Sequence, residues 1–327
     1  MRTFVAATAR LLALALLCRA ASLNAAESSA WKIDDHPALP PGDIGGWDDF
    51  AIRDVAILRL KNKWLMLYKG ISLSEDERVC ALGIAESANG LAWRKSLEES
   101  AIPVKTDEEP SSPCLALWND GFLAAYVVHR LPRDNEESDR LAERVELASS
   151  NDGLMWQPLG TLAGLSFNRP DFIFLRISLY ADGGLLHLWW IGINQEGKPA
   201  LCHSVSRDGL TWSKPNMQPA AAIDSREILG ARIYPSGDFF VLVYLASDSP
   251  NKAEIVTKIS RDAVTWQRKG PPEFVLPTAD SRNISMPEMI FTPEGARLFY
   301  SETQLGESGF RGAVLRSAFC PKSGYAK

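Results

Sequence analysis

The chain has 327 residues, of which 46% are hydrophobic and 9% aromatic, enough apolar material for a buried core in one large domain or two ordinary ones. Its formal net charge of -5 at pH 7 lacks the basic excess with which proteins bind nucleic acid or anionic membranes. We therefore expect a globular protein, a monomer, with no nucleic acid as partner.

Residues 1–26 are typical of a secretory signal peptide. A basic start at Arg2 is followed by an Ala- and Leu-rich stretch and then by small residues up to Ala26. Because Arg10 and Arg19 interrupt the apolar stretch, it is too short for a transmembrane helix. The sequence thus predicts a secreted or periplasmic protein with no membrane contact after signal cleavage.

Four copies of one short motif divide the mature chain. They read SANGLAW at 87–93, SNDGLMW at 150–156, SRDGLTW at 206–212 and SRDAVTW at 260–266. Their tryptophans lie 63, 56 and 54 residues apart. A fixed period of this size in a chain of short strands is typical of repeat architectures, and here it favours propeller blades.

The motif has the chemistry of a tight turn between strands. Its Asn or Asp can accept turn N–H groups, and the following Gly takes a positive φ without steric cost. The Trp then opens the next strand and can bury about 150–250 Å² against a neighbouring sheet. Because Ala263 replaces Gly in the fourth copy, that turn is expected to be strained or to have another geometry.

Within each repeat, apolar runs bounded by turn residues predict three strands before the motif. First strands begin about 58 residues apart, at Asp54, Ser112, Pro170, Leu229 and Met286. Second strands, the most aromatic, are predicted at 64–68, 122–126, 185–190, 239–244 and 297–300. Third strands are predicted at 79–84, 145–148, 201–205, 255–259 and 312–316.

The fifth repeat lacks its own Trp strand, and the start of the mature chain supplies a copy. Trp31 lies 62 residues before Trp93, which is one period. A blade completed by strands from both chain ends leaves no loose sheet edge. The sequence therefore predicts an all-β, five-bladed β-propeller with four-stranded blades as a single domain over 27–327, closed by an N-terminal strand near Trp31.

The cysteines and histidines show no pattern of metal ligands. Four cysteines of the mature chain are candidates for buried free thiols or for disulfides, namely Cys80, Cys114, Cys202 and Cys320. The histidines are not expected to cluster; they are His36, His129, His187 and His203. We therefore expect neither a metal ion nor another cofactor.

The repeated Asp-Gly turns and the first strands that begin with Asp or Pro before apolar residues resemble the five-bladed glycoside hydrolase clan. That clan includes family 43 arabinosidases and xylosidases, family 32 fructosidases and family 130 enzymes. The resemblance covers essentially the whole mature chain. It implies a secreted glycoside hydrolase that acts on a carbohydrate substrate.

The resemblance also implies three acids on the innermost strands: an Asp in the first blade, a second Asp two repeats later and a Glu one repeat beyond. Asp54 matches the first, although Val55 replaces the clan's Pro. Asp171 follows 117 residues later, in a segment 169–171 that resembles the fructosidase Arg-Asp-Pro with its last two residues exchanged. Glu227 follows 56 residues after Asp171.

Cleavage of a glycosidic bond needs one carboxylate to activate water or attack the sugar, and one protonated carboxyl to release the leaving group. A third acid beside the Glu raises its pKa and keeps it protonated. The resemblance thus implies Asp54 as base or nucleophile, Glu227 as acid and Asp171 as modulator or sugar ligand. Alternatively, Asp54 and Asp171 only cap strands, and Glu227 is solvated.

Further residues near the same rim are candidate ligands for the sugar. Sugar sites use aromatic faces for stacking and fork-shaped donors for hydroxyls or carboxylates. The candidate substrate-binding residues are Trp47, Asp49, Arg53, Arg169, Glu288 and Arg311.

Two other functions remain open. A propeller that binds glycan without cutting it is favoured by the departures from the clan's pattern at Val55 and Pro170. A sialidase-type enzyme would use an Arg triad, for which Arg53, Arg169 and Arg311 are candidates. Sialidases, however, carry six blades and a turn with one residue between Asp and Gly.

Overall fold

A computed structural model describes residues 30–73, 78–130, 143–162, 175–193, 196, 198–249, 252–275, 287–306 and 309–325. The predicted signal peptide, 1–26, lies outside these residues. Among the residues described, no helix has the length and apolarity needed to cross a membrane.

The regular structure in this part of the chain is almost entirely β-strand, and the strands follow one order. First strands are β2 (Ala51–Arg59), β6 (Glu108–Trp118), β10 (Leu175–Asp182), β14 (Glu227–Ser236) and β19 (Glu288–Phe291). Second strands are β3 (Trp64–Leu73), β7 (Gly121–Arg130), β11 (Leu185–Ile193), β15 (Phe239–Ser249) and β20 (Gly295–Gly306). Third strands are β4 (Arg78–Ser87), β8 (Glu143–Ser150), β12 (Pro199–Ser206), β16 (Lys252–Ser260) and β21 (Gly309–Pro321).

Short outer strands and turns complete the described elements. The outer strands are β1 (Lys32–Ile33), β5 (Arg94–Lys95), β9 (Gln157–Thr161), β13 (Asn216–Pro219), β17 (Gln267–Arg268) and β18 (Phe274–Val275). Two 3₁₀ turns, η1 (Ala220–Ala222) and η3 (Lys322–Gly324), follow β13 and β21. The predicted start of the third repeat at Pro170 lies outside the described residues, and β10 is described from Leu175.

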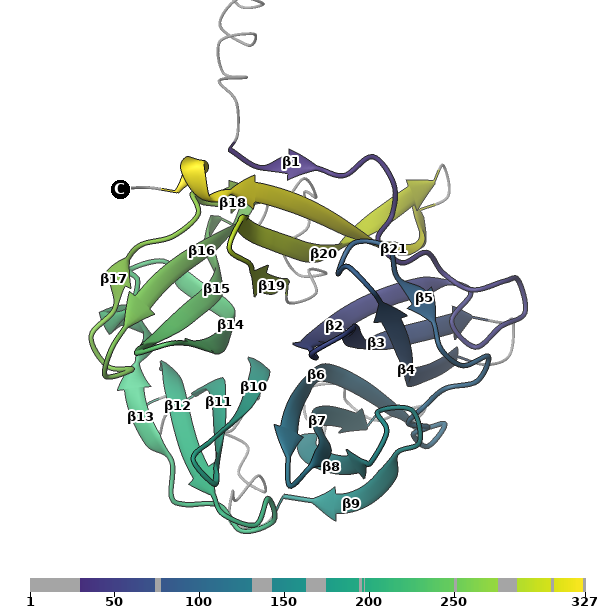
Figure 1. Ribbon diagram of the computed structural model, residues 1–327, viewed down its shortest axis with the longest axis horizontal. Helices are drawn as coiled ribbons and strands as arrows, with labels where there is room; N and C mark the ends of the chain where they lie inside the picture. Colours follow the sequence, from purple (N-terminus) through teal and green to yellow (C-terminus); the bar gives the residue numbers. More distant parts are fainter. Residues whose placement is uncertain are drawn as a thin grey trace, which may run out of the picture.

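The described strands form four hydrogen-bonded sheets, which surround a common axis with the first strands innermost (Figure 1). Three sheets each contain one repeat, in the orders β6-β7-β8-β9, β10-β11-β12-β13 and β14-β15-β16-β17, the last with β18 added. The fourth sheet has eight strands, because Ala51 of β2 pairs in parallel with Ala313 of β21. Two of the repeats predicted as separate blades are therefore joined through one backbone pair.

The N-terminal segment lies against the last strands of the chain. Lys32 and Ile33 of β1 pair with Phe319 and Ala318 of β21. Trp31 is buried, donates its indole N–H to the carbonyl of Pro272 at 2.9 Å and meets Phe274 edge to face at 5.6 Å. Residues from the two ends of the chain thus share one sheet.

The turn motifs at 87–93, 150–156 and 206–212 share one hydrogen-bond pattern, illustrated by 206–212, and the motif at 260–266 has the corresponding bonds to the Asp262 carboxylate. The hydroxyl of Ser206 accepts the N–H of Gly209 at 2.9 Å and donates to the carboxylate of Asp208 at 2.9 Å. That carboxylate accepts the N–H groups of Leu210 and Thr211 at 2.9 and 2.7 Å. The motif therefore satisfies its own backbone donors, which is why it tolerates different neighbouring sequences.

Ala263 keeps the backbone of the other turns and does not adopt a different one. Its φ is 56°, close to the 73°, 81° and 79° of Gly90, Gly153 and Gly209. A Cβ in this left-handed region is crowded by the neighbouring carbonyl. Of the two expected outcomes, the structure therefore has the strained one.

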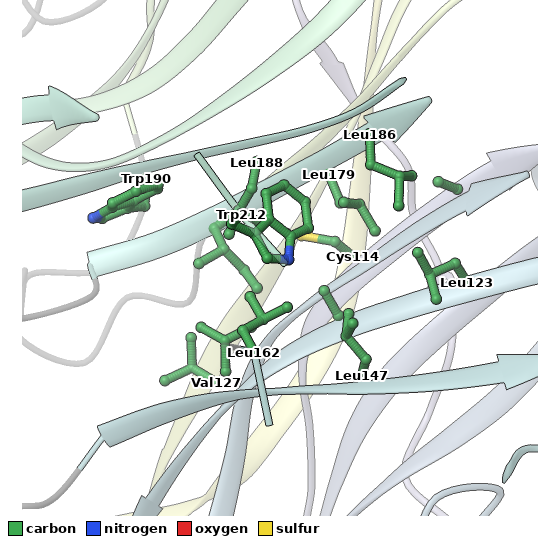
Figure 2. Close-up of a cluster of buried hydrophobic side chains, with 14 of the residues drawn as sticks. Cys114, Leu123, Val127, Leu147, Leu162, Leu179, Leu186, Leu188, Trp190 and Trp212 are labelled. Carbon is green, nitrogen blue, oxygen red and sulfur yellow. The ribbon is translucent and has the colours of Figure 1, made fainter. Parts of the chain in front are cut away.

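The hydrophobic cores lie between neighbouring sheets. One of them combines Cys114, Leu123 and Leu147 of one sheet with Leu179 and Leu188 of the next (Figure 2). Trp212 is buried in this core and donates its indole N–H to the carbonyl of Gly209 at 3.0 Å. The motif tryptophan thus joins one repeat to the next, as its size predicted.

Candidate active site

The innermost strands are bulged near their starts, and the bulges hold left-handed residues. Pairing shifts register between Arg53 and Val55 in β2 and between Leu175 and Ile177 in β10, with Asp54 and Arg176 as the extra residues. A third shift follows Ser111 in β6. Asp54, Ser112 and Arg176 have φ values of 40°, 48° and 67°. Such strained non-glycine residues cost roughly 1–3 kcal/mol each and cluster at functional sites.

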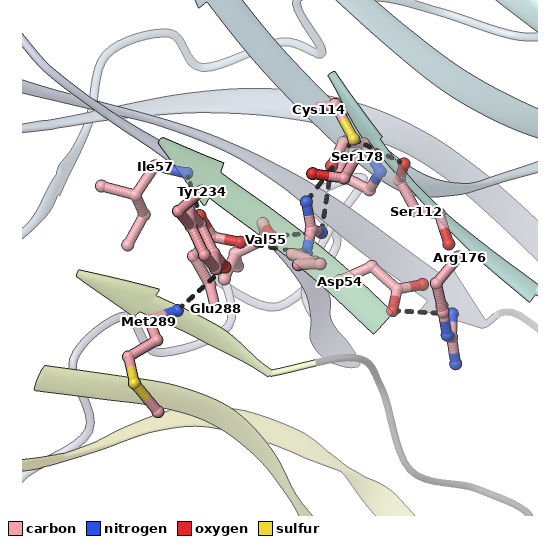
Figure 3. Close-up of polar contacts among 12 residues, drawn as sticks. Asp54, Val55, Ile57, Ser112, Cys114, Arg176, Ser178, Tyr234, Glu288 and Met289 are labelled. Atoms are coloured by element: carbon pink, nitrogen blue, oxygen red, sulfur yellow. Dashed lines mark hydrogen bonds and ion pairs between the residues drawn. The ribbon is translucent and has the colours of Figure 1, made fainter. Parts of the chain in front are cut away.

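Asp54 and Arg176 point toward each other across the axis (Figure 3). The guanidinium of Arg176 donates to the Asp54 carboxylate at 3.1 Å, and the aspartate is 5% exposed. Burial alone raises the pKa of this carboxyl. The positive charges of Arg176, Lys69 and Arg53 outweigh burial and hold the pKa of Asp54 below its usual value. Asp54 is therefore an ionised carboxylate at neutral pH.

A second group of charges lies beside Asp54 on the neighbouring strands. Lys69, opposite Arg53 in the β2–β3 pairing, forms an ion pair with Glu109, which also binds Arg78 at 3.0 Å. Burial lowers the pKa of Arg53, an effect that the charge of Asp54 opposes. Burial raises the pKa of the Glu109 carboxyl, but its ion-pair partners Lys69 and Arg78 outweigh burial and lower that pKa.

The segment before β2 contains an aromatic side chain, Trp47, and the polar groups of residues 47–49 bind other residues of the protein. Trp47 stacks on Tyr68 with ring centroids 5.8 Å apart and donates to the carbonyl of Glu98 at 3.1 Å. Asp48 is buried, accepts the Tyr68 hydroxyl at 2.8 Å and pairs with Lys95 at 2.6 Å. Asp49 accepts the N–H of Gly45 at 2.8 Å, so it closes a local turn.

Glu288 is buried within the fold, where it pairs with Arg232 on the axis. The Nε atom of Arg232 lies 3.0 Å from a carboxylate oxygen of Glu288, and both side chains are 4% exposed. Arg232 also donates to the carbonyls of Val55 and Pro113 at 2.9 and 3.1 Å. The other oxygen of Glu288 accepts the N–H of Ile57 at 3.4 Å. This pair therefore ties β14, β19, β2 and β6 together across the axis.

The other predicted site residues are exposed, lie outside the described residues or are described by their backbone alone. Glu227 is the first residue of β14, and its side chain is exposed. Asp171 and Arg169 lie outside the described residues, and Arg311 is described only as part of the backbone of β21. Of the predicted trio, the structure thus describes Asp54, buried in β2, and Glu227, exposed at the start of β14.

The expectation that the histidines do not cluster was wrong for two of them. The Nδ1 atom of His187 lies 3.1 Å from Nε2 of His203, because β11 and β12 pair and bring residues 16 apart onto adjacent strands. Trp189 stacks on His203 at 3.7 Å. Burial and the neighbouring His187 lower the pKa of His203 to about 4. No group of three or more His, Cys, Asp or Glu side chains suited to a metal occurs among the described residues.

The four cysteines of the described chain are free thiols, and all are buried. Of the two states that the sequence leaves open, thiols or disulfides, the structure has the thiols. Burial raises the pKa of Cys114 to about 11 and that of Cys202 to about 12. These thiols are thus packing residues and poor nucleophiles.

Sequence reasoning missed several residues of this site, including Arg176, Lys69 and Arg232. A charged side chain within an apolar strand is a signal that could have found Lys69, in WLMLYKGISL, and Arg232, in EILGARIYPS. Nothing local in the sequence identifies Arg176 as the partner of Asp54, because their separation of 122 residues is bridged only by the ring of sheets.

No known protein-family profile matches the chain. An uncharacterized protein of Mycobacterium tuberculosis is 27% identical over 184 residues, which cover 53% of this chain and 61% of that protein.

Solved structures show what fold the chain has. A family 117 glycoside hydrolase of the marine bacterium Zobellia galactanivorans has a TM-score of 0.62 at 13% identity, covering 89% of this chain and 90% of that one. A family 62 α-L-arabinofuranosidase of Coprinopsis cinerea has a TM-score of 0.58 at 13% identity, covering 88% and 96%. A family 32 β-fructofuranosidase of Bombyx mori has a TM-score of 0.58 at 14% identity, covering 86% and 62%. These likenesses confirm the resemblance to the propeller glycoside hydrolase clan.

Proposed function

We propose that this chain is a glycoside hydrolase in which Asp54 is the base or nucleophile. The observation that carries the proposal is the buried Asp54 carboxylate, at the bulged start of the first innermost strand, beside three positive charges. An ionised carboxylate can take a proton from water or attack a sugar carbon. The glycoside hydrolase fold makes a carbohydrate the expected substrate.

In the proposed reaction, Glu227 gives its proton to the oxygen of the leaving sugar as the glycosidic C–O bond breaks. If the enzyme inverts, Asp54 takes a proton from the water whose oxygen bonds to the sugar carbon. If it retains, Asp54 first bonds to that carbon, and a water molecule then releases the sugar while giving its proton to Glu227. Asp171 completes the proposed trio as modulator or sugar ligand.

We also propose that residues 27–327 form one five-bladed propeller, with β1 as the outer strand of the last blade. The pairing of β1 with β21 and the burial of Trp31 support this closure.

Trp31→Ala should destabilise the whole fold by about 3–5 kcal/mol, as for other buried tryptophans. Unfolding in urea measures this loss, and wild-type stability would argue against closure. We further propose that residues 1–26 are an export signal and that the mature protein is a secreted or periplasmic monomer.

The enzymatic proposal is tested with Asp54→Asn and Glu227→Gln on a panel of aryl glycosides and oligosaccharides. Each variant should lower kcat by a factor of roughly 10² or more, since general acid or base catalysis alone contributes that much. Asp152→Asn is a matched control, because Asp152 lies in a turn motif whose first copy already has an asparagine, Asn89, at this position. Unchanged turnover in both site variants would remove these carboxyls from the mechanism.

A glycan-binding propeller without catalysis is the second candidate. The exposed position of Glu227 and the engagement of Asp54 by Arg176 favour it. Under this function, glycan binding is measurable by calorimetry, while no aryl glycoside or oligosaccharide of the panel is cleaved.

A further inference from the structure

Three of the innermost strands share one feature next to their bulges. Each has a residue with a positive φ, and the carbonyl of the following residue accepts a hydrogen bond from a side chain of another innermost strand. The residues with positive φ are Asp54 in β2, Ser112 in β6 and Arg176 in β10, and the carbonyls belong to Val55, Pro113 and Ile177. Backbone groups on the free edge of a strand need such partners when they are buried.

The guanidinium of Arg232 binds two of these carbonyls directly and the third through a thiol. Its Nη2 atom donates to the carbonyls of Val55 and Pro113 at 2.9 and 3.1 Å (Figure 3). Its Nη1 atom donates to the thiol of Cys114 at 3.5 Å, and this thiol donates to the carbonyl of Ile177 at 3.0 Å. Hydrogen bonds that start at one side chain therefore reach all three bulges.

Glu288 orients this guanidinium. One of its carboxylate oxygens lies 3.0 Å from Nε of Arg232, and the other accepts the N–H of Ile57 at 3.4 Å. Val55 and Ile57 are two residues apart in β2, so the ion pair binds a carbonyl and an N–H on one edge of that strand. Both charged side chains are 4% exposed, so water does not compete for these bonds.

The conformation of Asp54 depends on such support. At a φ of 40° its Cβ is crowded by the neighbouring carbonyl, and a residue in this region persists only where the surrounding structure holds it. The bond from Arg232 fixes the peptide group that follows Val55, one residue beyond the strained position. Without that bond, the buried carbonyl of Val55 loses a charged donor, and the bulge is free to relax.

We propose that Arg232 is a positioning residue, which maintains the bulge at Asp54 and so holds the Asp54 carboxylate against Arg176. This inference rests on the proposed role of Asp54 as base or nucleophile, and it adds a residue that acts through Asp54 without touching the sugar. Glu288 contributes by orienting the guanidinium. Because a displacement of about 1 Å at a reacting group can lower a rate by about 10²-fold, such support affects catalysis directly.

The test is Arg232→Lys, which keeps the positive charge and removes the planar set of donors. With a substrate that the wild type cleaves, kcat should fall about tenfold to 10²-fold, while KM stays nearly the same. The acid limb of kcat/KM should move to higher pH, because the Asp54 carboxylate loses its contact with Arg176 and its pKa rises. A kcat and an acid limb equal to those of the wild type would overturn the inference.

A matched arginine separates positioning from a general loss of stability. Arg297→Lys is the control, because the Arg297 side chain is 12% exposed and pairs with Asp34 in the segment before β2. It should keep the kcat and the acid limb of the wild type, and a loss as large as that of Arg232→Lys would overturn the inference. If Arg232→Lys does not fold, the double variant Arg232→Met with Glu288→Leu removes both buried charges together and should change kcat and the acid limb in the same direction.

A measurement that needs no turnover separates this inference from the proposed enzymatic function. NMR titration of the Asp54 carboxyl, assigned by comparison with Asp54→Asn, gives its pKa directly. The positive charges that lower this pKa in the wild type are those of Arg176, Lys69, Arg53 and Arg232. In Arg232→Lys the pKa of Asp54 should be higher than in the wild type.

The two proposals then fail separately. A higher pKa of Asp54 in Arg232→Lys, together with no cleavage of any glycoside by the wild type, would defeat the enzymatic proposal alone. Asp54-dependent cleavage, together with the same pKa of Asp54 in the wild type and in Arg232→Lys, would defeat the positioning inference alone.

Discussion

Individual residues of this chain adopt backbone conformations that side chains disfavour, and they do so for two reasons. Asp54 and Arg176 have positive φ values at bulges and face each other across the axis. Ala263 has a positive φ in a turn where the Asp262 carboxylate accepts the N–H groups of Val264 and Thr265 at 2.9 and 2.7 Å. The strained bulges place the side chains of Asp54 and Arg176 beside each other, and the strained turn at Ala263 keeps the backbone geometry of the repeated motif.

Exchanging Ala and Gly in the turns should change stability in opposite directions. Gly209→Ala should lower the free energy of unfolding by about 1 kcal/mol, since the new Cβ is strained at φ 79° and lies 3.3 Å from Leu186. Ala263→Gly should raise it by a smaller amount, because relief of strain is partly offset by loss of a buried methyl group. Urea unfolding measures both, and equal destabilisation by the two variants would contradict strain at Ala263.

The acid limb of the pH profile should report Asp54, if it is the base or nucleophile. Because Arg176, Lys69 and Arg53 lower its pKa against burial, the carboxylate remains ionised below its ordinary pKa of 3.8. The rate should therefore fall only when the pH drops below that value. Arg176→Gln removes a positive charge, so it should move the acid limb of kcat/KM to higher pH. A limb that is the same in wild type and variant would show that another group controls it.

At the scale of elements, the turn motif is a self-contained unit of the fold. The Asp208 carboxylate accepts two backbone N–H groups and a Ser206 hydroxyl, and these bonds lower its pKa to about 2. Asn89 makes the corresponding bonds in the first turn with its amide oxygen, to Leu91 and Ala92 at 2.9 and 3.1 Å. The turn therefore needs an oxygen acceptor, and ionisation strengthens it.

The turns should make stability depend on pH in acid. Because the folded pKa of Asp208 is lower than its unfolded value of 3.8, its contribution is fully present above 3.8 and is lost as the pH falls through about 2. Asp208→Asn retains an oxygen acceptor and cannot titrate. Urea unfolding should therefore find wild type more stable near neutral pH, with the difference closing as the pH falls from 3.8 to about 2. A constant difference over that interval would contradict the stabilising role of ionisation.

At the scale of the whole molecule, the inner strands of different sheets are joined by polar contacts on the axis. Arg232 of β14 contacts Glu288 of β19 and the carbonyls of Val55 in β2 and Pro113 in β6. On the side away from Asp54, the pair borders a cavity of about 290 Å³ whose lining includes Leu117 and Tyr234. Arg232 thus connects the innermost strands next to a cavity that apolar side chains do not fill.

Breaking the axial pair from one side should be costly. Arg232→Met leaves the buried Glu288 carboxylate without its cation and should lower the free energy of unfolding by about 3–5 kcal/mol. Adding Glu288→Leu removes the isolated charge, so the double variant should be less destabilised than the sum of the two single ones. Thermal and urea unfolding measure this cycle, and additive losses would show that the two groups do not stabilise each other.

Local physical chemistry made much of this fold predictable from sequence. The turn motifs, the aromatic second strands and the approximate places of the first strands depend on neighbours within a few residues, so their patterns are visible along the chain. The likeness to propeller glycoside hydrolases followed from the same local patterns and their period. For the candidate site, Asp54 was found because it resembles the clan's first Asp and lies near the start of a first strand, while its partners were not found.

By itself, the sequence determined the repeat, the turn chemistry and the position of Asp54, since each follows from residues that are close along the chain. Only the tertiary structure decided that Arg176 meets Asp54, that Arg232 meets Glu288 and that His187 meets His203. These contacts depend on how sheets surround an axis and how strands are registered. In a ring of sheets, the position of a strand around the axis decides which residues meet. The separation of two residues along the chain does not reveal that position.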